Sequence, residues 1–331
     1  FPTGGSMSNF MSLIMARDKK DKEAGKKGIQ RKLVAYTSNN SHYSVVKNAS
    51  LTGLGRENIR VIKSEKNGRI SISDLKNKIK EDIVNGFTPF YINATAGTTV
   101  LCAFDSVLDL VPICKEYKIW LHLDGAFGGS VIFSDKYKYL VKGIEFTDSF
   151  CFNAHKTLGA PLSTSVLLVK EKRDLFNSFN NEATYLFQTA DEEYNLGRTS
   201  FECGRRNNAL KFWCLWKAIG TNGIAELVDH EFALSDVARN YIKKNTDYKL
   251  YSFEESLSVC FNYKNYDPKD LCTKLYEKAK LMVGFGSFNN NTFIRLVTIN
   301  SENTEEDILN FFKILEDFVL NNCVLLKKKQ Q

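Results

Sequence analysis

The chain has 331 residues, of which 43% are hydrophobic and 25% are charged, with a formal net charge of +7. This composition excludes an extended disordered chain and is sufficient for a sizeable core, in one large domain or two smaller ones. The basic residues are dispersed apart from clusters at residues 19–32 and 327–329, and no aromatic residue interrupts the first cluster. We interpret both clusters as solvated surface and predict no nucleic-acid partner.

Up to about residue 170, segments typical of strands alternate with segments typical of helices. The predicted strands cover residues 33–37, 59–62, 90–93, 119–123, 150–152 and 165–169, and the predicted helices cover 41–49, 71–85 and 106–118. In the second helix, Ile72, Leu75, Ile79 and Ile83 recur at helical spacing. Strands separated by helices of this length predict parallel pairing with right-handed crossovers.

The pattern changes after about residue 220. Helices are predicted at residues 225–243, 268–280 and 305–320, and strands at 259–263 and 293–297. Acidic residues after Thr304 suit the positive N-terminal end of the last helix. We therefore predict an α/β protein with a large domain over residues 1–220, built on a mainly parallel sheet, and a small C-terminal α+β domain over residues 221–331.

The eight cysteines form no C-x-x-C pair and have no spacing typical of metal ligands. No apolar run approaches membrane-spanning length, and no signal-peptide pattern opens the chain. We expect small buried thiols in a reduced compartment, no metal, no membrane association and a cytoplasmic location. The chain opens at Phe1 with no methionine before it, from which we expect a fragment or a truncated product.

Two polar segments occupy positions where ligands collect in open α/β sheets. Residues 4–9 (Gly-Gly-Ser-Met-Ser-Asn) precede an apolar helix and could bind a phosphate at its N-terminus. A serine-rich helix cap is the commoner meaning of such a string. In residues 122–129, Asp124 ends a buried strand and small residues follow, which leaves room for a flat ligand. A turn-capping Asp is an equally compatible interpretation.

Two further segments complete the set. Lys156 ends the string Asn-Ala-His-Lys after strand 150–152, and a lysine of lowered pKa suits Schiff-base chemistry, although most lysines are solvated. Residues 94–99 (Ala-Thr-Ala-Gly-Thr-Thr) form a turn that carries hydroxyls. A phosphate cradle, an acid for a ring nitrogen, a lysine for an aldehyde and hydroxyls for a phenolic oxygen together match the needs of pyridoxal 5'-phosphate.

In the same order, these strings resemble those of the group II pyridoxal-phosphate-dependent decarboxylases, closest to the glutamate and cysteine sulfinate decarboxylases. The matching segments are residues 41–44 (Ser-His-Tyr-Ser), 94–105 (Ala-Thr-Ala-Gly-Thr-Thr-Val-Leu-Cys-Ala-Phe-Asp), 122–129 (His-Leu-Asp-Gly-Ala-Phe-Gly-Gly) and 153–156 (Asn-Ala-His-Lys). The likeness extends over nearly the whole chain. It implies a type I pyridoxal-phosphate fold, similar to that of aspartate aminotransferase.

The resemblance implies a role for each matching residue. Lys156 would bind the cofactor aldehyde covalently, and Asp124 would pair with the pyridine nitrogen. The other implied cofactor contacts are Ala126, His42, Thr99, Ser6, Met7, Ser8 and Asn153. Taken alone, His42 and Thr99 could be ordinary core and turn residues. His122 and His230 are interpreted as structural.

Two side chains are implied to contact the substrate. His155 would meet its carboxylate or move protons. Arg295 lies in the apolar run 293–297, where an unpaired guanidinium would be costly. The resemblance assigns to Arg295 a substrate carboxylate, and a buried structural Glu is the alternative partner.

Residues 183–188 (Ala-Thr-Tyr-Leu-Phe-Gln) match a family segment that closes over the neighbouring subunit's site. The match implies that Tyr185 protonates Cα after CO2 leaves, and that the chain forms a homodimer. Three residues depart from the family pattern, because Ala154, Gly125 and Phe127 replace a proline, an alanine and a Trp or Tyr. None of these changes removes a catalytic atom.

We predict a carboxy-lyase of amino-acid metabolism that decarboxylates an acidic L-amino acid. Glutamate, giving GABA, is placed ahead of aspartate and cysteine sulfinate. A truncated subunit without activity is one alternative. An aminotransferase of the same fold is another, and its product would be a 2-oxo acid instead of an amine and CO2.

Overall fold

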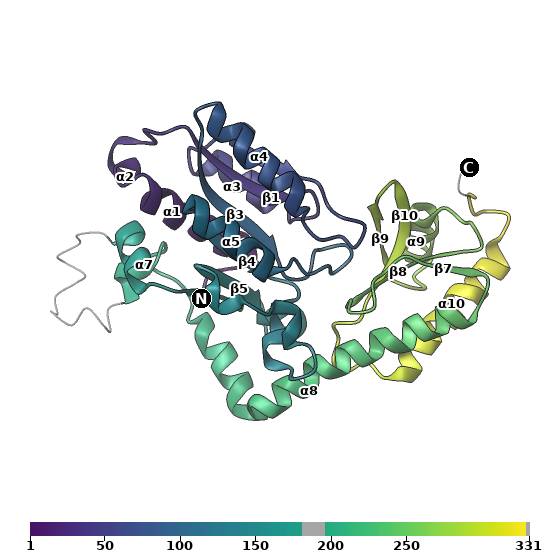
Figure 1. The fold of residues 1–331 in the computed structure, drawn as a ribbon. Helices are drawn as coiled ribbons and strands as arrows, with labels where there is room; N and C mark the ends of the chain where they lie inside the picture. The colour runs from purple at the N-terminus through teal and green to yellow at the C-terminus, as the bar shows by residue number, and fades with distance from the viewer. Residues whose placement is uncertain (181–195, 329–331) are drawn as a thin grey trace.

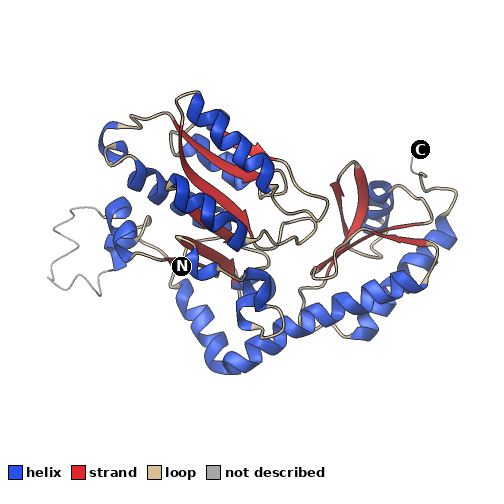
Figure 2. Cartoon of the chain, in the orientation of Figure 1, coloured by secondary structure: helices blue, strands red, loops and turns tan. Residues whose placement is uncertain are grey.

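The computed structural model describes residues 1–180 and 196–328. Two lobes, each built around its own sheet, are joined by the long helix α8 (Asn208–Lys244), which runs along both of them in Figure 1. The strands, red in Figure 2, form one sheet in each lobe, and the helices lie on the outside. This arrangement agrees with the predicted fold class.

The larger lobe contains a six-stranded sheet in the order β2-β1-β3-β4-β5-β6. Its strands are β1 (Leu33–Ser38), β2 (Ile59–Ile62), β3 (Thr88–Thr95), β4 (Trp120–Gly125), β5 (Ser149–Asn153) and β6 (Ser165–Val169). The first five run parallel, as predicted, but β6 pairs antiparallel with β5. The connection from β5 to β6 contains only the four-residue helix α6 (Ala154–Thr157), which is too short to cross the sheet.

Helices cover both faces of this sheet, and for that reason β1 is buried along its whole length. On one face, Val34 and Tyr36 join the core beneath α4 (Ile72–Val84) and α5 (Val107–Tyr117). On the other face, Leu33 and Ala35 pack with the apolar side of α1 (Gly5–Lys20). The remaining elements of this lobe are α2 (Ala24–Lys27), α3 (Ser44–Leu51), α7 (Lys172–Phe179), η1 (Arg56–Asn58), η2 (Gly129–Phe133), η3 (Lys138–Val141), η4 (Ile144–Phe146) and η5 (Leu196–Thr199).

The smaller lobe is an antiparallel sheet in the order β7-β8-β10-β9. Its elements are β7 (Tyr248–Leu250), β8 (Ser258–Tyr263), α9 (Pro268–Glu277), β9 (Gly284–Phe288), β10 (Asn291–Val297) and α10 (Glu305–Asn322). Phe261 and Phe312 lie at the centre of its core. Thr304 and Asp307 form a reciprocal capping box at the start of α10, which agrees with the helix start read from the sequence.

Helix α8 connects the two cores. At Gly220 its backbone has φ 70° and ψ 178°, a conformation open mainly to glycine, and the helix bends there. Phe232 belongs to the core of the larger lobe and Leu234 to that of the smaller one. The domain division between residues 220 and 221 stays a prediction, since packing passes from one core to the other further along α8.

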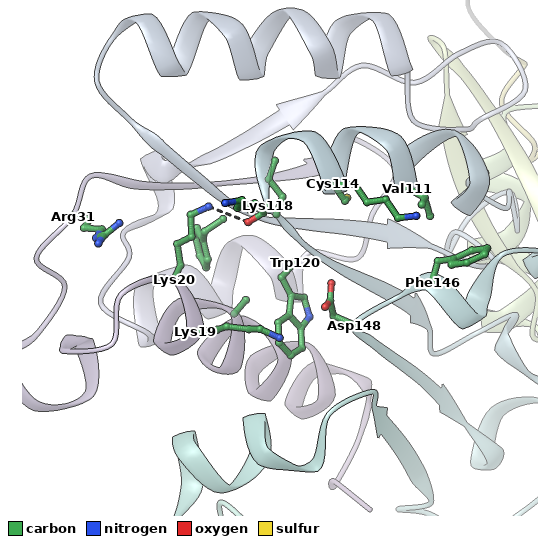
Figure 3. Close-up of a pocket in the computed structure, with 13 residues that line it drawn as sticks. Lys19, Lys20, Arg31, Val111, Cys114, Lys118, Trp120, Phe146 and Asp148 are labelled. Atoms are coloured by element: carbon green, nitrogen blue, oxygen red, sulfur yellow. Dashed lines mark hydrogen bonds between the residues drawn. The ribbon is translucent and has the colours of Figure 1, made fainter.

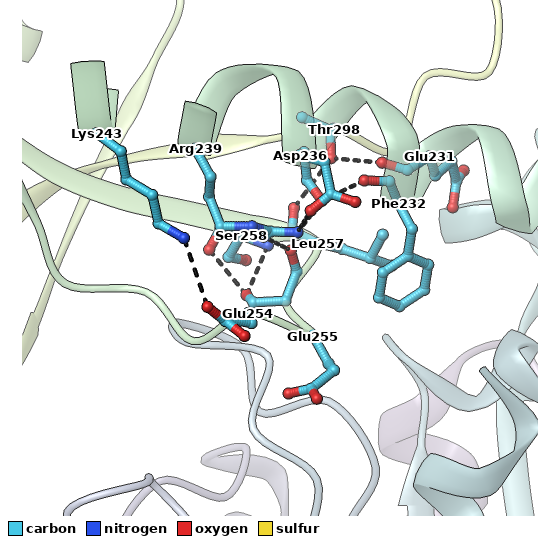
Figure 4. Close-up of polar contacts among 12 residues, drawn as sticks. Glu231, Phe232, Asp236, Arg239, Lys243, Glu254, Glu255, Leu257, Ser258 and Thr298 are labelled. Atoms are coloured by element: carbon cyan, nitrogen blue, oxygen red, sulfur yellow. Dashed lines mark hydrogen bonds and ion pairs between the residues drawn. The ribbon is translucent and has the colours of Figure 1, made fainter. Parts of the chain in front are cut away.

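Polar contacts secure this junction (Figure 4). Arg239 of α8 donates to Asp236 Oδ1 at 2.6 Å and to the carbonyl oxygen of Ser256 at 2.6 Å. Thr298 donates to the carbonyl oxygen of Glu231 at 3.1 Å.

In the described part of the chain, no helix combines the length and apolar character needed to span a bilayer.

Candidate active site

The predicted acid lies at the carboxyl end of β4, inside the protein. Asp124 is 3% exposed. Its Oδ2 accepts a hydrogen bond from Asn9 Nδ2 at 2.7 Å, and its Oδ1 accepts one from the backbone N–H of Ala126 at 3.0 Å. Two N–H donors thus hold the Asp124 carboxyl group in one orientation, in a largely dry setting.

Lys156 follows the neighbouring strand β5, on helix α6. Because β4 and β5 are adjacent and parallel, their carboxyl ends lie at the same edge of the sheet. Burial lowers the pKa of Lys156, and the carboxylate of Asp124 opposes part of that effect. A lowered pKa supplies neutral amine, which is the form that reacts with an aldehyde.

The start of α1 approaches this edge closely. A Cβ on Gly5 would lie 2.7 Å from the Cβ of Ala126 and 3.3 Å from Asn153 Nδ2, so only glycine fits there. The N-cap residue Gly4 makes no side-chain cap, and the first N–H groups of the helix are left for another partner. The Asn153 Oδ1 is buried and has no hydrogen-bond partner among the described residues. An uncapped helix start beside an unpaired amide suits a phosphate group.

The predicted contacts in residues 6–8 differ in exposure. Ser6 is exposed and Met7 is half-buried. The hydroxyl of Ser8 is buried and lies 3.1 Å from Ser165 Oγ on β6. Their roles as cofactor contacts stay predictions.

His42 and Thr99 line a cavity of about 280 Å³, and Ser287 of the smaller lobe lines it too. The Nδ1 of His42 is 2.8 Å from Ser44 Oγ. Burial lowers the pKa of His42, Asp124 raises it and Lys156 lowers it. Asp124 and Lys156 both act on the charge of His42, although neither side chain lines this cavity.

Arg295 enters the same region from β10 of the smaller lobe. Its Nε donates to the carbonyl oxygen of Val100 at 3.2 Å, and its guanidinium lies 5.6 Å from the ring centroid of Phe127. Its charge helps to lower the pKa of Lys156. Within residues 1–180 and 196–328 it forms no ion pair with a carboxylate. The two partners predicted for Arg295, a substrate carboxylate and a structural Glu, both stay predictions.

His155 is half-buried, and its Nδ1 lies 2.8 Å from the carbonyl oxygen of Thr164. Burial lowers its pKa, and the contact with Thr164 partly opposes that shift. The role of His155 stays a prediction.

Tyr185 lies outside the described residues, so its role also stays a prediction. In the described ranges, no three side chains among His, Cys, Asp and Glu come together as metal ligands.

Three residues at this site were not assigned roles from the sequence. Asn9 hydrogen-bonds Asp124, and Ser44 hydrogen-bonds both Asn9 and His42. The Sγ of Cys151 lies 3.7 Å from Asp124 Oδ1, and burial raises the pKa of this thiol well above its usual value. Asn9 and Ser44 fall inside quoted motifs, but their partners are distant in sequence.

Comparison with known proteins agrees with this geometry. A family model described as the pyridoxal-dependent decarboxylase conserved domain matches residues 1–264. The acidic amino acid decarboxylase GADL1 of Mus musculus is 36% identical over 333 residues, covering 93% of this chain and 60% of that protein. GADL1 of Homo sapiens is 34% identical over 352 residues, covering 99% of this chain and 66% of that protein. The chain thus spans about 60 to 66% of the length of these curated relatives.

Solved structures show the same fold. The apo form of mouse CSAD has a TM-score of 0.87 and 31% identity, and the match covers 96% of this chain and 70% of that one. Oryza sativa TDC, solved with PLP and tryptamine, has a TM-score of 0.90 and 22% identity, covering 97% and 69%. The second likeness concerns the fold alone. From the family match and the identity to its curated relatives, the chain belongs to the pyridoxal-dependent decarboxylase family.

Proposed function

We propose that this chain binds pyridoxal 5'-phosphate and decarboxylates an L-amino acid. The observation that carries the proposal is the convergence of Asp124 and Lys156 at one sheet edge, beside the uncapped start of α1. The site fits the cofactor in three respects. Gly5 lets the start of α1 lie closer to Ala126 than any residue with a Cβ could, Asn153 Oδ1 lacks a partner among the described residues, and Lys156 has a lowered pKa.

Each group has a defined task in this proposal. When bound, the cofactor would supply an aldehyde and a conjugated ring that accepts electrons from Cα. Lys156 would hold the aldehyde through its amine, and Asp124 would keep a proton on the ring nitrogen. The start of α1 would bind the phosphate. His42 would border the ring, and Thr99 would lie near its oxygen.

The substrate we propose is an acidic amino acid, with glutamate ahead of aspartate and cysteine sulfinate. Arg295 supports this choice, because its half-buried charge acts on the pKa of Lys156 and forms no ion pair with a carboxylate of the described residues. A guanidinium binds a carboxylate through two parallel hydrogen bonds. The two relatives named acidic amino acid decarboxylases also support it. His155 would then contact the carboxylate that leaves or assist proton movement.

We further propose that the working unit is a homodimer and that Tyr185 protonates Cα. Both proposals rest on the match of residues 183–188 to the family's loop. A phenol beside Cα decides the product, because protonation at that carbon completes decarboxylation.

The test is a titration of the purified chain with pyridoxal phosphate, followed by a CO2-release assay across a panel of L-amino acids. Glutamate, aspartate or cysteine sulfinate should release CO2 and yield the amine. Borohydride reduction followed by peptide mapping should place the cofactor on Lys156. The Lys156→Ala variant should lose both signals, whereas Lys211→Ala, a nearby control, should keep them.

Each alternative function predicts a different result in this experiment. Formation of a 2-oxo acid without CO2 would identify an aminotransferase. Cofactor binding without turnover of any amino acid would indicate a subunit without activity. Reduction that labels another lysine would overturn the assignment of Lys156.

A further inference from the structure

A layer of buried polar side chains lies directly behind Asp124, between α1 and the sheet. Asn9 of α1, His122 and Trp120 of β4, and Ser149 of β5 are each at most 4% exposed. Polar groups this deep must satisfy one another, because water does not reach them. Their contacts form one continuous chain of hydrogen bonds that ends at Asp124.

The direction of every bond in this chain follows from chemistry. A carboxylate only accepts hydrogen bonds, so Asn9 turns its Nδ2 toward Asp124 Oδ2, at 2.7 Å. The Oδ1 of Asn9 can then only accept, and it lies 3.0 Å from His122 Nε2. His122 must therefore carry its proton on Nε2.

The far half of the chain agrees with this assignment. Burial lowers the pKa of His122 to about 4, so the ring is neutral and its Nδ1 accepts. Ser149 Oγ, 2.8 Å from that Nδ1, donates to it and accepts from Trp120 Nε1 at 2.9 Å. An indole N–H only donates, so the chain begins at Trp120. Trp120 borders a basic cavity of about 620 Å³ and has Lys19 Nζ 5.0 Å from its ring (Figure 3).

A side branch reaches His42. Asn9 Nδ2 also donates to Ser44 Oγ at 3.1 Å, which leaves the Ser44 hydroxyl to donate to His42 Nδ1 at 2.8 Å. The backbone N–H of Ser44 points to the same nitrogen at 3.2 Å. Both contacts require Nδ1 of His42 to be an acceptor. Asn9 thus donates directly to Asp124 and, through Ser44, fixes His42 Nδ1 as an acceptor. His42 is the histidine that borders the proposed ring site.

We propose that Asn9 and His122 are positioning residues that hold the Asp124 carboxylate in the orientation from which it keeps a proton on the cofactor's ring nitrogen. This inference rests on the proposed function. It assigns a role to His122, which the sequence analysis interpreted as structural. A chain of donors that all point toward one carboxylate polarises each member, and the low dielectric of the interior strengthens each bond.

The test compares four variants with the parent chain. Asn9→Ala removes the donor to Asp124, and His122→Leu leaves the amide of Asn9 without the donor that orients it. His122→Gln is the conservative variant, since one amide can accept from Ser149 and donate to Asn9. Ser12→Ala is the matched control, because Ser12 lies one turn further along α1 in the same buried layer. Its hydroxyl bonds Tyr91 and the backbone carbonyl oxygen of Asn9, and neither bond involves the side-chain amide that donates to Asp124.

Three quantities are measured for each variant. They are the Kd for pyridoxal phosphate, the nitrogen NMR shift of cofactor labelled at the ring nitrogen, and the free energy of unfolding. We expect Asn9→Ala and His122→Leu to raise the Kd about tenfold or more and to move the nitrogen signal toward the unprotonated form. His122→Gln should stay within about threefold of the parent. Ser12→Ala should lose stability while the Kd and the nitrogen signal are unchanged.

The outcomes separate this inference from the proposed function. A parent chain that binds no cofactor at Lys156 would overturn the proposed function and this inference with it. A parent with a protonated ring nitrogen, together with Asn9→Ala and His122→Leu variants that keep its Kd and nitrogen signal, would overturn the positioning role alone. Where His122→Leu does not fold, Ser149→Ala replaces it, because this change removes only the donor to Nδ1. An unchanged nitrogen signal in Ser149→Ala and Asn9→Ala would then reject the proposal.

Discussion

At the scale of single residues, the environment sets the charge that each site residue carries. Burial lowers the pKa of Lys156, which raises the share of neutral amine, and it lowers the pKa of His122 to about 4, which leaves that ring neutral. Asp124 accepts two N–H bonds at a buried position, whereas Lys156 is half-buried. The candidate site thus combines a lysine of lowered pKa with a carboxyl group held by N–H donors.

Asp124→Asn tests the role of that charge. A neutral amide cannot stabilise a proton on the ring nitrogen, so we expect CO2 release to fall by about 100-fold or more, equivalent to several kcal/mol. Some cofactor should remain bound, since Lys156 and the start of α1 are unchanged. Steady-state CO2 release and cofactor absorbance measure the two effects.

Asp82→Asn is the control, because Asp82 is a buried acid that pairs with Arg60 and Tyr36 on another part of the sheet. It should lower stability and leave the turnover of the folded fraction unchanged. Turnover of Asp124→Asn within a few-fold of the parent would contradict the proposed role.

At the scale of elements, two helices differ in how they begin. α10 has a complete capping box, in which Thr304 and Asp307 satisfy each other's backbone groups. α1 starts at Gly4 and Gly5 without any side-chain cap. The first arrangement stabilises a helix, and the second leaves N–H groups and positive potential for an anion. Helices α2 to α7 also lack a side-chain cap, and α1 differs from them in that its start lies against Ala126 and Asn153.

Gly5→Ala should weaken phosphate binding at that start. The new Cβ would lie 2.7 Å from the Cβ of Ala126, so α1 or the turn after β4 must shift. We expect the Kd for pyridoxal phosphate to rise about tenfold, and stability to fall by about 1 to 3 kcal/mol. Fluorescence titration and chemical denaturation measure these changes. Gly25→Ala, where a Cβ meets no atom within 4 Å, should change neither.

At the scale of the whole molecule, the site lies between two lobes that share α8. The cavity of His42 and Thr99 is lined from both lobes, and Arg295 comes from the smaller one. The junction also buries Glu231 completely, and neither of its carboxylate oxygens has a hydrogen-bond partner among the described residues. Burial raises the pKa of Glu231 from 4.5 to about 9.

This buried acid predicts a pH dependence of folding. The folded chain holds the proton of Glu231 more tightly than the unfolded chain does, so its contribution to stability falls as the pH rises from about 4.5 to about 9. Glu231→Gln should therefore be more stable than the parent at pH 8, by on the order of 2 kcal/mol, and close to it at pH 5. Denaturation at both pH values measures the difference. An equal difference at both would refute it, and Glu226→Gln, exposed on the same helix, should show none.

The proposed dimer leads to a mixing experiment. Lys156→Ala lacks the amine that holds the cofactor but has an intact Tyr185, and Tyr185→Phe has the reverse. Each homodimer should be nearly inactive, whereas mixed dimers should recover one complete site if the loop crosses between subunits. CO2 release from verified mixed dimers is the measurement. Absence of recovery would place Tyr185 in the site of its own subunit, and a monomer active at high dilution would reject the dimer.

The sequence by itself determined the features that depend on near neighbours along the chain. Strands at residues 59–62 and 165–169 were predicted with their observed bounds, since alternating or continuous apolar runs reflect local periodicity. Asp124 and Lys156 were predicted as site residues because each lies in a short string beside a strand end. Helix α7 and the first half of α8 were not predicted, and in α8 exposed apolar residues such as Leu210 and Trp213 obscure the helical pattern.

Only the tertiary structure decided what depends on contacts between distant residues. The antiparallel pairing of β6, the bend at Gly220 and the contacts of Arg295 with Val100 and Phe127 have no local signature. Asn9 and His122 are separated by 113 positions, and their hydrogen bond exists because α1 packs across β4. A sequence pattern specifies which face of an element is buried, but not which polar atoms meet there. Those pairings are set by the packing of whole elements, which brings buried donors and acceptors together away from water.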